Sequence, residues 1–345
     1  MENQIPIRIA FLGNVDSGKS TLMGVLSKNT LDDGKGTIRK NVFRHQHEQE
    51  TGRTSSISTN YCKINDNPVL FTDLCGHEKY LKTTLFGLNL VKPDYCLIMV
   101  GSNMGVSKMT REHILASAAL GYKIIICVTK IDICPSHVLK KTLNDIGNLI
   151  KRVNRKIIEI KDDTNTDNLI NDLVQVVPLL KLSSVSGFNI DLLRTIIGKM
   201  KTEKIYPVNK PTEFVIDRRY NIKGVGIVLA GMINKGIIKV GNNLFINTKD
   251  GIKEVIVKSI FDEEDNSVSE LNAGHYCTIN IRLKNCKKIK LKDGMMMVEE
   301  NNSVFKREFI ALIYIFHHST TIKANCKKHP GYQPVIHCNG IRQSA

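Results

Sequence analysis

Residues 13–20 have the types and the spacing needed to hold a phosphate group. They read G-N-V-D-S-G-K-S and match the pattern G-x-x-x-x-G-K-[ST]. Backbone N–H groups of such a loop wrap a phosphate, Lys19 would reach the β and γ oxygens, and the Ser20 hydroxyl would bind Mg²⁺. A glycine-rich turn that matches by chance is the alternative. The strand-like run before the loop and the apolar T-L-M-G-V-L after it favour phosphate binding. The predicted contacts are Asn14, Val15, Asp16, Ser17, Gly18, Lys19, Ser20 and Thr21.

The segment T-K-I-D at 129–132 follows the apolar run I-I-I-C-V and bears on the choice of base. The Asp132 carboxylate can accept from guanine N1–H and the 2-amino group, two donors that adenine does not present together, while the stem of Lys130 covers the ring. Alone the pattern is weak, because a Lys and an Asp two residues apart commonly mark a solvated strand end. After a phosphate-binding loop, at the end of a later strand, it indicates guanine.

Two further strand ends carry polar residues. Ser183, Ser184 and Val185 end one strand, and the Ser184 amide would lie near guanine O6, although a serine pair alone is commonly a helix cap. The other strand ends in D-L-C-G-H at 73–77. There Asp73 would hold Mg²⁺ through water, the Gly76 amide would sense the γ-phosphate, and His77 would position the attacking water. A lone His beside a strand end is commonly structural, but its place directly after D-x-x-G favours a catalytic role, so the predicted catalytic residues are His77 and Lys19.

The elements that must position these residues alternate along the first 200 positions. Short β-branched runs lie at 7–12, 69–73, 95–100, 124–129 and 176–182, each followed by a turn and a helical period. This alternation predicts a mostly parallel sheet with helices on both faces and with ligands at the carboxyl ends of its strands. Residues 161–168 are expected to form a polar loop.

The pattern changes after the prolines at 207 and 211. From residue 212 short alternating strands are separated by Gly and Asn turns, which predicts an antiparallel β-barrel. The predicted domains are therefore an α/β nucleotide-binding domain at 1–205, a barrel at 206–302 and the start of a second barrel at 303–345. About 40 residues are too few for an independent barrel. The third unit is expected to be incomplete, either because the chain is truncated or because the protein does without the rest.

Five motifs in order, GNVDSGKS, GRTSSIS, DLCGHEKY, TKID and SSVSG, resemble the GTPase domain of translation factors related to elongation factors Tu and 1-alpha. Residues 214–246 resemble their second-domain barrel, and 308–318 and 333–345 resemble opening strands of the third. The variants TGRTSSIS, VTKIDICP and HCNGIRQSA are most similar to the branch named GTP-binding proteins one and two. The resemblance covers nearly the whole chain and implies a P-loop GTPase that uses GTP, GDP and Mg²⁺.

The switch segment departs from the pattern of this superfamily. It usually reads R-G-I-T-I, whereas residues 53–57 read R-T-S-S-I. Ser56 therefore stands at the position of the Mg²⁺-binding Thr and keeps the hydroxyl. Ser55 replaces an apolar residue that, with the counterpart of Val15, would separate the histidine from the water, so His77 is expected to be less restrained.

The base-reading motif departs at its first position. Thr129 replaces the Asn of N-K-x-D, which puts in question the bracing of the phosphate loop by that side chain. Base selection by Asp132 is expected to be unaffected.

Charge bears on the partners. The chain has 49 Lys and Arg against 33 Asp and Glu, a net charge of +16, and the excess runs through both halves. Such a charge fits a polyanionic partner such as RNA, and a coding bias rich in Lys, Asn and Ile explains it equally well. The basic run at 282–292 could contact RNA phosphates, or it could be a solvated hairpin.

Cysteine usage and the N-terminus indicate a cytoplasmic protein. The nine cysteines include no C-x-x-C pair and several lie in apolar runs, which is typical of reduced core thiols. No signal peptide and no apolar run long enough to span a membrane are present in the sequence. Cys326, His329, His337 and Cys338 have atoms suited to zinc, but the barrel-like strands around them favour a structural role.

The sequence thus predicts a GTPase of the translation-factor type that hydrolyses GTP to GDP and phosphate as a conformational switch. The triphosphate would order the segments around Ser56 and Gly76, and hydrolysis would release the partner. The expected partners are RNA, tRNA or the ribosome, with an exchange or activating factor, and a monomer is expected. One alternative is a GTP-dependent binding or scaffold protein in RNA surveillance with negligible turnover. Another is an RNA-binding protein for which the nucleotide matters little.

Overall fold

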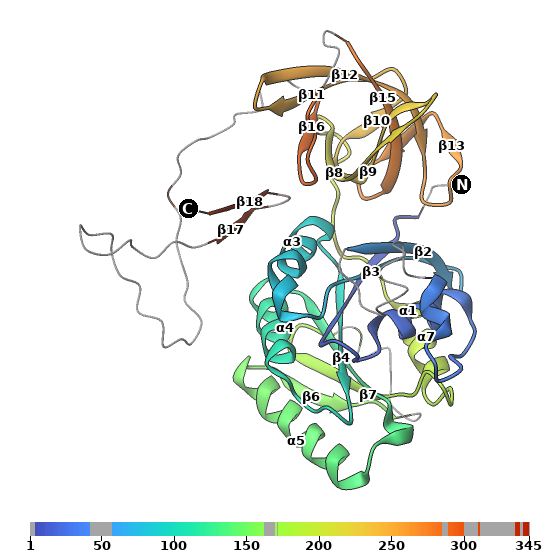
Figure 1. The fold of residues 1–345 in the computed structure, drawn as a ribbon, viewed down its shortest axis with the longest axis vertical. Coiled ribbons are helices and arrows are strands. Elements are labelled where there is room, and N and C mark those ends of the chain that lie inside the picture. Colours follow the sequence, from blue (N-terminus) through green and yellow to red (C-terminus); the bar gives the residue numbers. More distant parts are fainter. Residues whose placement is uncertain are drawn as a thin grey trace, which may run out of the picture. The chain divides into compact units, whose positions relative to one another are not determined.

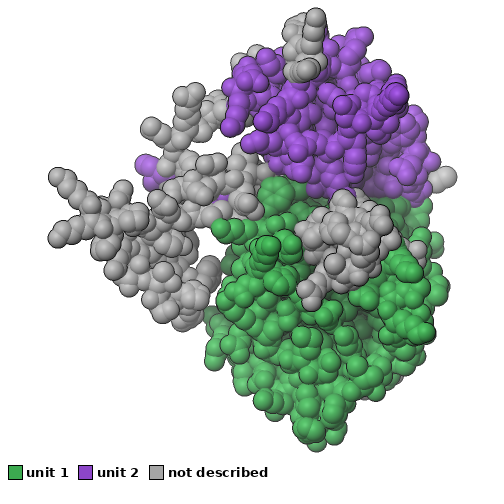
Figure 2. All heavy atoms as spheres, in the orientation of Figure 1, with its two compact units in different colours: residues 1–205 green, residues 206–345 purple. Residues whose placement is uncertain are grey.

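The chain divides into two compact units. The computed structural model describes residues 4–41, 57–161, 170, 172–284, 289–299, 310, 335–338 and 341–344. Contacts group Met1–Ile205 into unit 1 and Tyr206–Ala345 into unit 2 (Figure 1, Figure 2). The division falls at the proline-flanked linker. The proposed boundary between 302 and 303 lies outside the described residues and stays a prediction.

Unit 1 is an α/β domain. Its strands are β1 (Ile7–Gly13), β2 (Ser58–Ile64), β3 (Asn67–Asp73), β4 (Tyr95–Gly101), β5 (Lys123–Thr129), β6 (Lys156–Glu159) and β7 (Val176–Lys181). Its helices are α1 (Lys19–Lys28), η1 (Thr37–Asn41), η2 (Glu78–Tyr80), α3 (Leu81–Val91), α4 (Lys108–Ala119), η3 (Ile131–Ile133), α5 (Ser136–Arg152) and α7 (Ile190–Lys199).

One seven-stranded sheet organises this unit, in the order β2-β3-β1-β4-β5-β7-β6. All neighbouring pairs are parallel except β2, which runs antiparallel to β3. The predicted mostly parallel sheet is confirmed. The short strand β6 was not predicted, because its four residues K-I-I-E are partly exposed at the sheet edge and lack a long apolar run.

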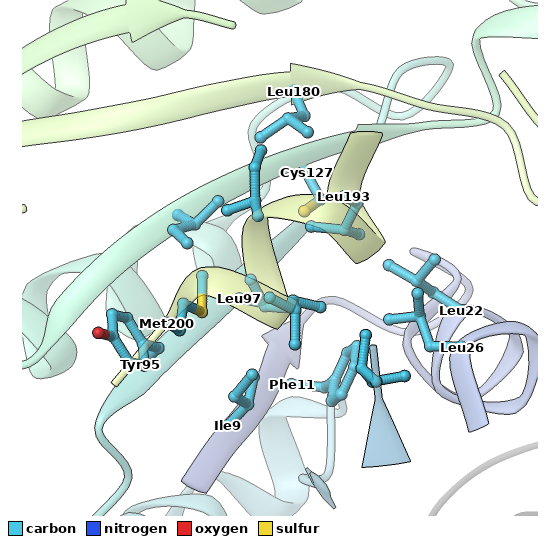
Figure 3. Close-up of a cluster of buried hydrophobic side chains, with 14 of the residues drawn as sticks. Ile9, Phe11, Leu22, Leu26, Tyr95, Leu97, Cys127, Leu180, Leu193 and Met200 are labelled. Atoms are coloured by element: carbon cyan, nitrogen blue, oxygen red, sulfur yellow. The ribbon is translucent and has the colours of Figure 1, made fainter. Parts of the chain in front are cut away.

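Helices cover both faces of the sheet because its central strands are apolar on both sides. Alternate residues of a strand point to opposite faces. Ile9 and Phe11 of β1 therefore pack with Leu22 of α1 and Leu193 of α7 in one core (Figure 3), whereas the other face packs under α3, α4 and α5. Because these strands run parallel, their carboxyl ends lie at one edge of the sheet, where ligands bind in such folds.

Unit 2 contains a closed antiparallel barrel, which confirms the prediction for this part of the chain. Six strands form the ring in the order β11-β16-β8-β9-β15-β12, and pairing of β11 with β12 closes it. Alternate positions of these strands, such as Phe214 and Ile216, fill the interior. The ring strands are β8 (Glu213–Ile222), β9 (Gly226–Lys235), β11 (Asn243–Thr248), β12 (Gly251–Phe261), β15 (Tyr276–Leu283) and β16 (Met296–Val298).

Shorter strands complete unit 2. They are β10 (Ile237–Lys239), β13 (Ser267–Val268), β14 (Glu270–Asn272), β17 (Val335–Cys338) and β18 (Ile341–Ser344). The last two form an antiparallel pair. Most of the predicted third unit lies outside the described residues.

Two sequence expectations concern the rest of the described chain. Six cysteines of the described residues take part in no disulfide bond: Cys62, Cys75, Cys96, Cys127, Cys134 and Cys277. Burial raises the pKa of both Cys96 and Cys127 to about 12. Within the described residues, no helix combines the length and apolar character needed to cross a membrane.

Candidate functional site

The loop after β1 folds around one of its own carbonyl groups. Gly13 has φ +144°, and a side chain there would collide with the carbonyl oxygen of Met99. Ser17 Oγ and Lys19 Nζ both donate to the Asn14 carbonyl oxygen at 2.8 Å. Gly18, in the left-handed region at φ 87°, then caps the N-terminus of α1. The sequence therefore directs this loop and the first turn of α1 to one place.

Three polar side chains meet behind the loop. Lys19 is only 6% exposed, and burial lowers the pKa of its ammonium group, with the charge of Asp73 opposing that shift. Ser20 Oγ donates to Asp73 Oδ2 at 2.5 Å. Hydroxyl and carboxylate oxygens of this kind are the ligands that Mg²⁺ prefers, so this pair fits a magnesium ion.

The segment after β3 approaches the loop without a side chain between them. A Cβ at Gly76 would lie 2.5 Å from Lys19 Nζ and 2.6 Å from the Gly13 carbonyl oxygen. The next residue, His77, is exposed, and its Nδ1 accepts from the Lys79 amide at 3.1 Å. That bond requires an unprotonated Nδ1, so the neutral ring carries its proton on Nε2, the nitrogen left for a ligand.

The carboxyl ends of β5 and β7 supply the remaining residues. Thr129 is buried, while Lys130 takes a left-handed conformation at φ 59° that turns the chain into η3 and places Asp132 on the surface. After β7, Ser183 Oγ accepts from the amides of Val185 and Ser186 at 3.3 and 3.1 Å. The serine pair therefore forms a tight turn at the sheet edge.

A cavity of about 760 Å³ brings most of these residues together within unit 1. Fourteen of the predicted site residues line it: Val15, Asp16, Gly18, Lys19, Ser20, Thr21, Gly76, His77, Thr129, Lys130, Asp132, Ser183, Ser184 and Val185. Asn14, Ser17 and Asp73 are not among the lining residues, but each accepts a hydrogen bond from the side chain of a residue that is. Ser56, together with Ser55, lies outside the described residues.

Comparison with known families decides what kind of domain holds this cavity. The model of the elongation factor Tu GTP-binding domain matches residues 5–202. The chain belongs to this family. This is a family of translation-factor-type GTPases, and membership supports the binding of GTP and GDP.

Curated relatives match nearly the whole chain. GTP-binding protein 1 of Xenopus laevis is 36% identical over 373 residues, which span 99% of this chain and 56% of that protein. Human GTP-binding protein 2 is 34% identical over 375 residues, spanning 99% of this chain and 61% of that protein. The chain thus spans between half and two thirds of the length of these relatives.

A solved structure supports the fold. Translation elongation factor SelB from Methanococcus maripaludis, in complex with the GTP analogue GppNHp, aligns with a TM-score of 0.65 at 21% identity. The alignment covers 88% of this chain and 56% of SelB. The resemblance to elongation factors Tu and 1-alpha and to GTP-binding proteins one and two is confirmed.

The sequence left open whether Thr129, which stands where the family has Asn, still braces the loop after β1. In the structure it does. Its hydroxyl Oγ1 donates to the Ser17 carbonyl oxygen at 2.9 Å, across 112 positions of the sequence. Thr129 therefore ties the end of β5 to the loop after β1.

The sequence analysis missed one part of the cavity wall, supplied by the segment that follows α1. Its lining residues are Asp32, Gly34, Lys35, Gly36 and Arg39. The signal was present as D-D-G-K-G, a run of turn formers with two side chains that bind nearby amides. What the sequence did not reveal is that this turn packs beside the cavity.

Metal sites other than the magnesium pair gain no support. No group of three or more His, Cys, Asp or Glu side chains suited to a metal occurs among the described residues. Cys326 and His329, considered for zinc, lie outside them.

Proposed function

We propose that this chain hydrolyses GTP to GDP and phosphate, and that the two nucleotide states control its engagement of tRNA, another RNA or the ribosome. The observation that carries the proposal is that one cavity joins the phosphate loop, Gly76 with His77, and the turns holding Asp132 and Ser184. These groups come from the ends of β1, β3, β5 and β7 and match the triphosphate and base of one guanine nucleotide.

Electrostatics support binding of the phosphates. The buried ammonium group of Lys19 is disfavoured by desolvation, which lowers its pKa, and negative phosphate oxygens would offset that cost. Ser20 and Asp73, with Ser56 as proposed third residue, would hold Mg²⁺, which supplies positive charge at the β and γ oxygens. The exposed Asp132 would accept from guanine while Ser184 donates its amide.

His77 is the proposed positioning group for the attacking water. It follows Gly76, whose backbone lies against Lys19, so the ring begins where the γ-phosphate would end. Its Nδ1 is held by the Lys79 amide, which fixes the ring relative to η2 and leaves Nε2 for the water. Lys19 contributes by stabilising the charge that develops on the transferred phosphoryl group.

The translation-linked role rests on relatives. Elongation factor 1-alpha of Methanobrevibacter smithii is 27% identical over 357 residues, spanning 96% of this chain and 79% of that protein. The net charge of +16 fits an RNA partner. We propose a cytoplasmic monomer whose turnover an activating or exchange factor accelerates.

Replacing His77 by Ala tests the catalytic part. We expect GTP affinity to stay within about twofold and ribosome-stimulated single-turnover hydrolysis to fall by about 10²-fold, because the ring acts on the nucleophile and not on ground-state binding. His137→Ala, which removes an exposed histidine of α5, is the matched control. Lost affinity with unchanged turnover would show that His77 is structural.

A GTP-dependent binding protein with negligible turnover is the second candidate. The observation that favours it is Ser55, where the family pattern has an apolar residue beside the histidine. Co-sedimentation with ribosomes in a non-hydrolysable GTP analogue and in GDP separates the two. Binding in the analogue without hydrolysis under single-turnover conditions supports the second candidate, and equal binding in both nucleotides contradicts the switch.

A further inference from the structure

The segment that follows α1 and runs into the start of η1 forms a compact loop at residues 32–39 that lines one side of the cavity. The Asp32 side chain is 8% exposed and accepts from three amides, those of Gly34 and Gly36 at 3.1 Å and that of Ile38 at 3.4 Å. Asp33 Oδ1 adds bonds from the amides of Lys35 at 2.9 Å and Thr37 at 3.3 Å, and Thr37 Oγ1 donates to Asp33 Oδ2 at 2.6 Å. The loop therefore has a defined shape of its own.

One end of this loop is tied to the base-reading turn. The Asp32 amide donates to the Ser184 carbonyl oxygen at 2.9 Å, although the two residues lie 152 positions apart. Leu31 continues this contact, since a Cβ on Gly187 would lie 3.1 Å from Leu31 Cδ1. The loop thus begins beside the position proposed for guanine.

The other end packs along α1. A Cβ on Gly24 would lie 3.0 Å from both Cγ1 and the carbonyl oxygen of Ile38, so the missing side chain of this glycine makes room for Ile38. Gly24 lies three residues after Thr21, on the same side of the helix, and Thr21 lines the cavity. The loop therefore ends about one turn of α1 below the phosphate-binding turn.

Arg39 and Lys35 are the cationic residues that this loop adds to the cavity wall. Arg39 Nε donates to the Gly36 carbonyl oxygen at 3.2 Å, and the guanidinium group fills the space that a side chain on Gly36 would need. Lys35 extends from the exposed crest of the loop. Asp32 and Asp33 keep their negative charges while they bind the loop's own amides and Thr37, so the two cations would act through direct contact with a ligand and not through an excess of positive charge in the loop.

In the proposed site a nucleotide reaches from the phosphate loop to Asp132. Its ribose and α-phosphate would then lie between the two ends of the 32–39 loop. We propose that the 32–39 loop is a second anion-binding element of the site, in which Arg39 and Lys35 contact the α-phosphate and ribose. The inference rests on the proposed GTP site and adds to it. Because GDP and GTP share the α-phosphate and the ribose, the contact contributes equally to the affinity for both nucleotides.

The experiment compares Arg39→Ala and Lys35→Ala in the full chain with Lys40→Ala, which removes the exposed cation next to Arg39 that does not line the cavity. Affinities for GDP and for a non-hydrolysable GTP analogue are measured by calorimetry. Both nucleotides are unlabelled, because a dye on the ribose would occupy the proposed contact. We expect each test variant to lose about tenfold for both nucleotides by the same factor, and the control to change by less than about twofold.

The outcomes separate this inference from the proposed function. If wild type and Lys40→Ala bind while Lys35→Ala and Arg39→Ala bind equally well, the loop is only structural and the inference is wrong. A loss confined to the GTP analogue also overturns it, since the cations would then act at the γ-phosphate. If wild type binds neither nucleotide, the proposed function fails and this inference fails with it. Arg39→Ala removes a hydrogen bond within the loop and could weaken binding by disturbing its fold. Lys35→Ala leaves every hydrogen bond named above in place, so a loss of affinity in that variant reports the contact with the nucleotide.

Discussion

At the scale of single residues, Asp132 provides the sharpest test of base recognition. A carboxylate accepts from both N1–H and the 2-amino group of guanine, and each charge-assisted bond contributes about 1.5–3 kcal/mol. Asp132→Asn should therefore weaken GTP binding by about 10²-fold or more. Xanthine keeps N1–H but has a carbonyl at position 2, which repels a carboxylate and accepts from an amide. We expect the variant to prefer XTP, measured by competition between the two nucleotides. A folded variant that still favours GTP would show that Asp132 does not contact the base.

Gly76 provides a second test at this scale, because its role depends on the absence of a side chain. An alanine methyl group would lie 2.5 Å from Lys19 Nζ and 2.6 Å from the Gly13 carbonyl oxygen, so the strand end and the phosphate loop must separate. We expect Gly76→Ala to weaken GTP binding by at least about tenfold, more than GDP binding, since the proposed role of this residue is to contact the γ-phosphate.

The matched control for Gly76 is a glycine within α5. Nothing lies within 4 Å of a Cβ built on Gly147, so alanine fits there without strain. Gly147→Ala should leave nucleotide affinity unchanged and raise the free energy of unfolding by about 0.5–1 kcal/mol, because alanine favours a helix over glycine. Equal effects of both substitutions on GTP affinity would contradict the close approach of Gly76.

At the scale of elements, the limits of sequence reasoning become clear. The phosphate loop and T-K-I-D were predictable, since each motif acts through a few consecutive residues placed by its own strand. Two hydrogen bonds could not be predicted, that from Thr129 to Ser17 and that from Asp32 to Ser184. Each joins residues more than 100 positions apart that only the order of strands in the sheet brings together. The edge strand β6 was missed for a related reason: pairing with β7, and not its own composition, makes it a strand.

Helix α4 contains a buried histidine that should make the protein sensitive to acid. His113 is 0% exposed, and within the described part of the chain neither of its ring nitrogens has a hydrogen-bond partner. Burial, and secondarily the positive charge of Lys19, lower the pKa of His113 from 6.5 to about 3. Between these two values the unfolded chain binds a proton that the folded chain refuses, so stability is lost as the pH falls, by at most about 1.4 kcal/mol per pH unit.

Replacing His113 by Leu removes this dependence. We expect the free energy of unfolding, measured by denaturant titration between pH 7 and pH 4, to fall less steeply in His113→Leu than in wild type. His137→Leu removes an exposed histidine and should keep the wild-type slope. Parallel profiles for wild type and His113→Leu would mean that the buried ring takes up its proton without cost.

At the scale of the whole molecule, the two units differ in what nucleotide binding can stabilise. The sheet of unit 1 has apolar cores on both faces, and the barrel of unit 2 has a core of its own. Units with separate cores generally open as separate cooperative units. The cavity is lined by residues of unit 1 only.

We therefore expect GDP to protect unit 1 selectively. A ligand at 100 times its Kd stabilises the state that binds it by about 2.7 kcal/mol, which slows amide exchange through global opening by about 10²-fold. Hydrogen exchange followed by mass spectrometry should show this slowing in peptides from β1, α1 and β5, with little change in peptides from β9 and β15. Lys19→Ala serves as the control and should abolish the protection, because it removes the cation that we propose binds the phosphates. Equal slowing in the barrel strands would contradict the expectation, since it would show that the two units open as one.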